Sequence, residues 1–352
     1  MLRVARVSAI PAMGVASSHR SKCEELTDQR TFRILERQYQ HEPLELVEPS
    51  DLRKDLASPA MRLVLFGETH DDPRAQSLEK ELYEKLTTTG RKWALALEFI
   101  ERDKAENVKT YLKNESGARP LFSSETEAAR YAELVETAKL SGNNVVAANA
   151  PRRLVSRVTK GGPLTIDSLE EAERKFLPPL PYRWAKPISK AYESRLMNFW
   201  SSSSSTTATT TTPSGGGSTT EKAPTTTADS SSSCSSSSSS RRQNLMAAQC
   251  LWDATMAHSV LDSLFQNDAV FLVCGRFHVE YFLGIVDHIE YILENDERFQ
   301  SIQLDRHEFR LLVAVPLPAA DFDAQELTDW AAVRHDPRVR ALADFVIFTR
   351  ED

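Results

Sequence analysis

Short runs of apolar residues alternate with segments of helical periodicity along most of the chain. Each run is strand-sized and apolar on both faces, as expected of a strand buried inside a sheet. Strands are predicted at 62–66, 93–97, 144–148, 269–274, 309–315 and 345–349. The alternation predicts an α/β fold with a mainly parallel central sheet flanked by helices.

Two helices between these strands are predicted from their end signals. The first begins with Asp72 as N-cap and Pro73 at its first position, and it ends near Gly90. The second begins at Ser124, whose spacing from Glu127 fits a capping box. The resulting β-α-β-α-β order predicts right-handed crossovers between parallel strands.

One α/β domain is predicted over residues 46–352, with a helical lid or subdomain over 151–268. A Ser- and Thr-rich tract over 201–240 interrupts this subdomain and lacks the apolar residues that a core needs. We predict a disordered surface insertion there, because long loops cost little additional entropy. Residues 1–45 are predicted to be an N-terminal extension. Its basic, Ser-containing start is typical of a transit peptide to the mitochondrion or another organelle; the alternative is a disordered N-terminus of a cytoplasmic protein.

Composition narrows the classes of partner. The chain has 352 residues and a formal net charge of −7 at pH 7, which gives no electrostatic reason to bind nucleic acid or an anionic membrane. No apolar run approaches the roughly 20 residues of a transmembrane helix. The four cysteines form no CxxC pair, and no CxxCH motif is present for covalent haem attachment. We expect a small-molecule ligand; a homodimer is a further hypothesis.

Polar residues follow four of the predicted strands at their carboxyl ends, where open α/β sheets bind ligands. Gly67 to His70 follows the first strand, Glu98 the second, Asn149 the third and Gly275 to His278 the fourth. In both GxxH tetrapeptides we expect the glycine to let the chain turn off its strand, while the histidine faces back over the sheet edge. A helix is predicted to start soon after each tetrapeptide, the second near Val279, and helix N-termini favour anionic groups.

Four of these side chains are candidates for two kinds of chemistry: Glu68, His70, Glu98 and His278. As metal ligands, two histidines with one or two glutamates suit Zn or non-haem Fe. As catalytic residues without a metal, a glutamate beside a histidine is a general acid/base pair. Each histidine alone is also compatible with a hydrogen-bonded structural role. Several charged groups converging on one sheet edge, however, require partners or a ligand.

Five ordered blocks of sequence resemble the ChaN-like domain of the Tiki/TraB/erythromycin-esterase (EreA/ChaN-like) superfamily. The blocks are Leu65 to Asp71, Ala96 to Asp103, Ala148 to Arg152, Trp252 to Ala257 and Gly275 to Val279. The resemblance implies an α/β core with a helical subdomain, and haem binding associated with iron uptake. In metal-dependent proteases and erythromycin esterases of the wider superfamily, the matching Glu and His positions serve catalysis or metal binding.

The resemblance therefore implies a haem- or iron-binding protein, with the ligand in the crevice at the carboxyl ends of the strands. The residues expected to contact haem are His70, His278, Tyr281, Asn149 and Arg152. A tyrosine can ligate ferric haem through its phenolate, although packing is the alternative interpretation of Tyr281. The alternative function is a metal-dependent hydrolase, esterase or peptidase-like, with Zn or Fe as its cofactor.

Overall fold

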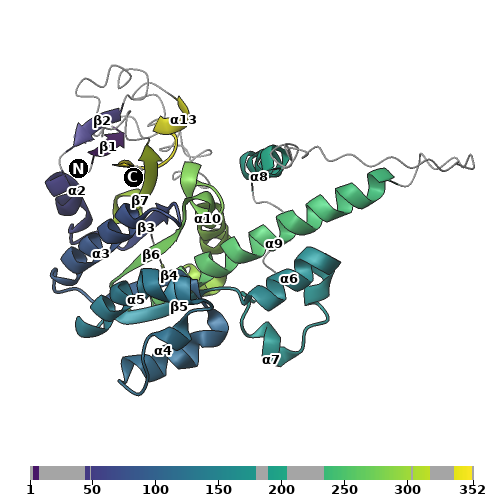
Figure 1. Ribbon diagram of the computed structural model, residues 1–352, viewed down its shortest axis with the longest axis horizontal. Coiled ribbons are helices and arrows are strands. Elements are labelled where there is room, and N and C mark those ends of the chain that lie inside the picture. Colours follow the sequence, from purple (N-terminus) through teal and green to yellow (C-terminus); the bar gives the residue numbers. More distant parts are fainter. Residues whose placement is uncertain are drawn as a thin grey trace, which may run out of the picture.

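The computed structural model describes residues 3–7, 44–47, 49–179, 189–203, 234–302, 304–317 and 337–350. Across these residues the strands form one eight-stranded sheet (Figure 1). Its order is β2 (Leu44–Val47), β1 (Arg3–Val7), β8 (Phe345–Arg350), β7 (Phe309–Leu317), β3 (Leu63–Glu68), β6 (Ala269–Gly275), β4 (Trp93–Glu101) and β5 (Asn144–Asn149). The strands from β8 to β5 are parallel, and β1 pairs antiparallel with β8 and β2. The predicted mainly parallel α/β sheet is confirmed.

Helices cover both faces of the sheet (Figure 1). One face packs against α2 (Pro49–Leu56), α3 (Pro73–Thr87), α4 (Ala105–Leu112) and α5 (Glu125–Leu140). The other face packs against α6 (Arg152–Gly161), α9 (Cys234–Ser263) and α10 (Ile285–Asn295). The remaining α-helices of the described residues are α7 (Glu171–Arg174), α8 (Lys190–Ser203) and α13 (Pro337–Arg340).

The central strands are apolar because they are buried on both faces. Every residue of β3 and of β6 is buried. Successive side chains of a strand alternate between faces, so Leu63 and Leu65 join one core while Val64 and Phe66 join the other. Such strands lack polar alternation, which is why short continuous apolar runs predicted them.

Local capping fixes the ends of α3 and α5. The Asp72 carboxylate accepts hydrogen bonds from the backbone N–H groups of Arg74 and Ala75, at 3.0 and 3.3 Å. Ser124 Oγ accepts the N–H of Glu127 at 3.1 Å. The Glu127 carboxylate reaches back to the N–H of Ser123 instead of that of Ser124. Both predicted helix starts are therefore confirmed, and only the second bond of the capping box is displaced by one residue.

Helices α6 to α9 lie between β5 and β6, where the helical subdomain was predicted. Helix α8 continues to Ser203 and α9 begins at Cys234, so both ends of the Ser- and Thr-rich tract are helical; residues 204–233 lie outside the described residues. Within the predicted N-terminal extension, β1 belongs to the sheet, and most of the remainder lies outside the described residues. In the described part of the chain no helix is long and apolar enough to cross a bilayer.

Candidate functional site

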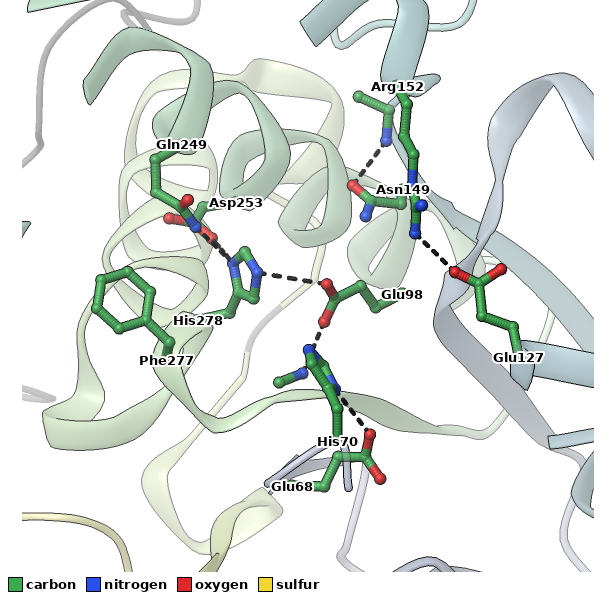
Figure 2. Close-up of polar contacts among 12 residues, drawn as sticks. Glu68, His70, Glu98, Glu127, Asn149, Arg152, Gln249, Asp253, Phe277 and His278 are labelled. Carbon is green, nitrogen blue, oxygen red and sulfur yellow. Dashed lines mark hydrogen bonds and ion pairs between the residues drawn. The ribbon is translucent and has the colours of Figure 1, made fainter. Parts of the chain in front are cut away.

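The order of the strands brings the predicted site residues to one edge of the sheet. Glu68 ends β3, Gly275 ends β6, and Glu98 lies in the second half of β4. These strands are direct neighbours, in the order β3, β6, β4. Because they are parallel, their carboxyl ends share one edge. Figure 2 shows that Glu68, His70, Glu98 and His278 lie close together there.

Glu68 and His70 form the first of two carboxylate–imidazole pairs. Glu68 Oε1 lies 2.9 Å from His70 Nδ1 and also accepts a hydrogen bond from the Tyr131 hydroxyl. The Glu68 side chain is fully buried, whereas 48% of the His70 side chain is exposed. The hydrogen bond with Glu68, together with the charge of Glu98, raises the pKa of His70 above its ordinary value, although partial burial opposes the rise. His70 is therefore a histidine oriented by a carboxylate and open to solvent.

His278 lies between two carboxylates and is buried. Its Nδ1 is 2.5 Å from Asp253 Oδ1, and its Nε2 is 3.4 Å from Glu98 Oε1. Burial alone would lower the pKa of His278, but the charges of Glu98 and Asp253 outweigh it and raise the pKa to about 10. Burial alone would raise the pKa of Glu98, but the charge and hydrogen bond of His278, the Gly275 N–H and the charge of His70 outweigh it. The pKa of Glu98 falls to about 2. Protonated His278 is thus fixed as a cation between two anions.

The two pairs meet across Gly275. Its N–H donates to Glu98 Oε2 at 2.6 Å, and a Cβ placed on it would lie 2.8 Å from His70 Cε1. Gly67 is equally confined, since a Cβ there would lie 2.7 Å from Val279 Cγ2. Neither glycine has a positive φ. Gly275 ends β6 and the chain leaves the strand there in a 3-10 turn, as expected, whereas Gly67 lies inside β3. At both positions an added side chain would crowd a neighbouring group.

The chain after the second GxxH also differs from expectation. No α-helix starts near Val279; two short 3-10 turns, Arg276–His278 and Glu280–Phe282, precede α10 instead. Tyr281 and Phe282 have positive φ values of 64° and 55°. Non-glycine residues seldom adopt this conformation, which is often associated with functional sites. The half-buried Tyr281 ring lies 5.4 Å from the Arg195 guanidinium of α8.

Asn149 and Arg152 lie at the same end of the sheet but are occupied by neighbouring groups (Figure 2). Asn149 Oδ1 accepts the N–H of Ala150 at 2.8 Å. The Arg152 guanidinium donates to Glu127 at 2.7 Å and lies 3.4 Å from Glu101. Their assignment as haem contacts stays a prediction.

The metal assignment of Glu68, His70, Glu98 and His278 also stays a prediction. Over the described ranges, no three His, Cys, Asp or Glu side chains are grouped so that they could hold a metal ion. The donor types remain suitable, because both histidines direct Nδ1 to a carboxylate, as metal-binding histidines commonly do.

Sequence reasoning did not select several residues that complete the site. Asp253 is fully buried on α9, bonds His278 and accepts a hydrogen bond from the Tyr192 hydroxyl. Glu79 on α3 is fully buried near Glu68, and burial followed by the Glu68 charge raises its pKa well above the ordinary value. Its position four residues after Ala75, on the apolar face of the helix, was the available signal.

A family match and a solved structure both relate this chain to ChaN-type proteins. The family described as "Haem-binding uptake, Tiki superfamily, ChaN" matches residues 57–289. The structure is similar to one titled "Cofacial heme binding to ChaN of Campylobacter jejuni", with a TM-score of 0.53, 15% identity, and coverage of 86% of this chain and 92% of that one. A structure of a succinoglycan biosynthesis protein has a TM-score of 0.40 and 10% identity, over 92% of this chain and 98% of that one. No curated protein matches the sequence. Since the family match spans most of the chain, this protein belongs to the ChaN-type haem-binding uptake family of the Tiki superfamily.

Proposed function

We propose that this protein binds haem as a cargo at the carboxyl-end edge of the sheet, with Tyr281 as the ligand of ferric iron. The observation that carries the proposal is the strained, half-buried conformation of Tyr281 immediately after the second GxxH. The Tyr281 phenolic oxygen accepts or donates no hydrogen bond within the described residues, and it is not among the fully buried atoms. A phenolate is one of the protein ligands of haem iron.

The surroundings of Tyr281 suit an amphipathic, anionic macrocycle. Burial and the Glu280 charge raise the pKa of Tyr281, while the nearby cations Arg195, Arg276 and Arg338 act in the opposite direction. Arginine side chains would favour both a phenolate and haem propionates. Phe277, also half-buried, lies against the same Arg195 guanidinium, 4.2 Å from its ring centroid, and offers apolar ring surface.

His70 is the more accessible of the two predicted histidine contacts. Both ring nitrogens of His278 already face carboxylates, and the ring is buried. His70 has one nitrogen bound to Glu68 and about half of its side chain in solvent. We assign His70 an electrostatic role beside the haem and not the iron ligand.

Hemin titration followed through the Soret band tests this proposal. The full chain should show saturable binding, and Tyr281→Phe should shift the Soret band and weaken binding at least tenfold. Tyr291→Phe, at a partly buried tyrosine of α10, is the matched control and should behave like wild type. Wild-type spectra and affinity in Tyr281→Phe would reject Tyr281 as the ligand, and a flat titration of the wild type would reject haem binding.

A second candidate function is hydrolysis by general acid/base chemistry, favoured by the solvent-open His70 with Glu68 behind it. The predicted form of this hydrolase uses Zn or Fe. Metal analysis of the purified protein, followed by ester and peptide substrate screens with and without added Zn or Fe, tests it. Activity that persists in His70→Gln would exclude His70 as the catalytic base.

A further inference from the structure

A cavity of about 1160 Å³ lies along the outer edge of β5 and is separate from the strand-end site. Its lining includes none of Glu68, His70, Glu98, Tyr281 or His278. One side of it is formed by the strand segment 144–147, and the other sides come from α4, the segment after α7 and the end of α9. The cavity therefore needs an explanation of its own.

The backbone of β5 offers unpaired hydrogen-bonding groups to this cavity. β5 is the last strand of the described sheet, with β4 on one side only. Ala148 O accepts a hydrogen bond at 2.8 Å from Ser259 Oγ of α9, so this carbonyl is satisfied from outside the sheet. Residues two apart in a strand direct their peptide groups to the same side. By this alternation the N–H and C=O of Val146 point away from β4, and Val146 lines the cavity. Apart from the ladder between β4 and β5, no backbone group of the described residues bonds them.

Apolar side chains from both layers of the fold form the walls of the cavity. Val108 and Leu112 of α4 belong to the core on one face of the sheet. Phe176 and Leu177 belong to the core on the opposite face. A strand placed beside β5 would direct its alternate side chains toward these two walls. Two apolar walls on opposite sides of the β5 edge suit the two-residue side-chain alternation of an extended chain.

We propose that this groove binds an extended peptide, which adds to the sheet as a strand beside β5. Main-chain bonds to an exposed edge, with pockets for alternate side chains, are an established mode of peptide recognition. The segment Asn144 to Ala147 is roughly 13 Å long at about 3.3 Å per residue, enough for a short peptide. A second folded copy fits less well, because the edge is recessed between α4 and the segment after α7, and the same edge of the copy is equally recessed.

The charges at the rim define the chemistry of the peptide. Lys109 and Lys175 are offset by Glu106 and Asp262, and the Lys109–Glu106 pair is closed at 2.6 Å. The rim therefore has little net charge to select a strongly charged ligand. The expected peptide is uncharged in its middle, with apolar, β-branched residues at alternate positions.

The test begins by panning a displayed library of random short peptides against the full chain. An enriched peptide is then synthesised with a fluorescein label, and its affinity is measured by fluorescence anisotropy. Val146→Pro removes the outward N–H at an edge position, where proline is tolerated. It should weaken binding about two- to tenfold, as expected for one hydrogen bond. Leu112→Glu should weaken binding more, because it places a charge in the apolar wall.

Two controls distinguish strand addition from non-specific peptide binding and from unfolding of the variants. Leu140→Glu, at a side chain 78% exposed on α5, should leave the affinity unchanged. The same peptide methylated on alternate backbone nitrogens should lose binding to the wild-type chain, which requires no protein variant. Failure to enrich any peptide, or equal binding of the methylated peptide, would overturn the proposal. Hemin binding that Leu112→Glu abolishes would also overturn it, by assigning the cavity to haem.

Discussion

Alanine substitutions at the two GxxH glycines should have different consequences, although the two tetrapeptides look alike. A Cβ at Gly67 would lie 2.7 Å from Val279 Cγ2 and 2.9 Å from the Cα of Arg276. The Cα of Arg276 belongs to the backbone directly after β6, so it can move away only if the end of β6 moves. We therefore expect Gly67→Ala to lower the free energy of unfolding by about 1–3 kcal/mol, the usual cost of overpacking a core.

At Gly275 the atoms in the way belong to a mobile side chain. The added Cβ would lie 2.8 and 2.9 Å from Cε1 and Nε2 of His70. About half of the His70 side chain is exposed, so its ring can rotate into solvent. Gly275→Ala should cost less than about 1 kcal/mol, in the range of a single exposed hydrogen bond. It should nevertheless separate His70 from Glu68, and the pKa of His70 should fall toward its ordinary value.

Urea denaturation and NMR titration together test this difference. The midpoint should fall clearly for Gly67→Ala at an unchanged slope, and little for Gly275→Ala. The His70 ring signals, assigned with a His70→Gln variant, should titrate at lower pH in Gly275→Ala than in wild type. Equal loss of stability in both variants, or an unchanged His70 titration in Gly275→Ala, would refute the argument.

Two further predictions concern the buried charges. His278→Ala should lower the free energy of unfolding by about 3–5 kcal/mol in denaturant titrations, because the fully buried Asp253 and the half-buried Glu98 would lose their shared cation. In the wild type, the contribution of His278 to the free energy of unfolding should be complete below pH 6.5 and lost as the pH rises toward 10. The contribution of Glu98 should be complete above pH 4.5 and lost as the pH falls toward 2. A melting temperature that does not change below pH 4.5 or above pH 6.5 would contradict the assignment of these charges to Glu98 and His278. For Glu79, whose folded pKa is raised, wild-type stability should fall as the pH rises above 4.5, so the gain from Glu79→Gln should be larger at pH 8 than at pH 4; a constant difference would contradict it.

Local signals predicted the fold well, because they act within a few residues. Asp72 and Ser124 cap the helices that their neighbours predict, and the continuous apolar runs became central strands. The meeting of Glu68 with Glu98 and His278 was also predictable, since each lies at or beside the carboxyl end of a parallel strand. Asp253 was not: it lies inside a helix, and only the packing of α9 over β6 brings it to His278.

The two GxxH histidines have different surroundings because their strands have different neighbours. His278 follows β6, between β3 and β4, so Glu98 reaches it from one neighbour while Asp253 of α9 closes the other side. Its charge is balanced within the protein, and it can hold Glu98 in place without touching a ligand. His70 follows β3, has one carboxylate partner and keeps half of its side chain in solvent. A ligand arriving at this edge would therefore meet His70 first, and the charges of Asp253, His278 and Glu98 behind it would set the electrostatic field around it.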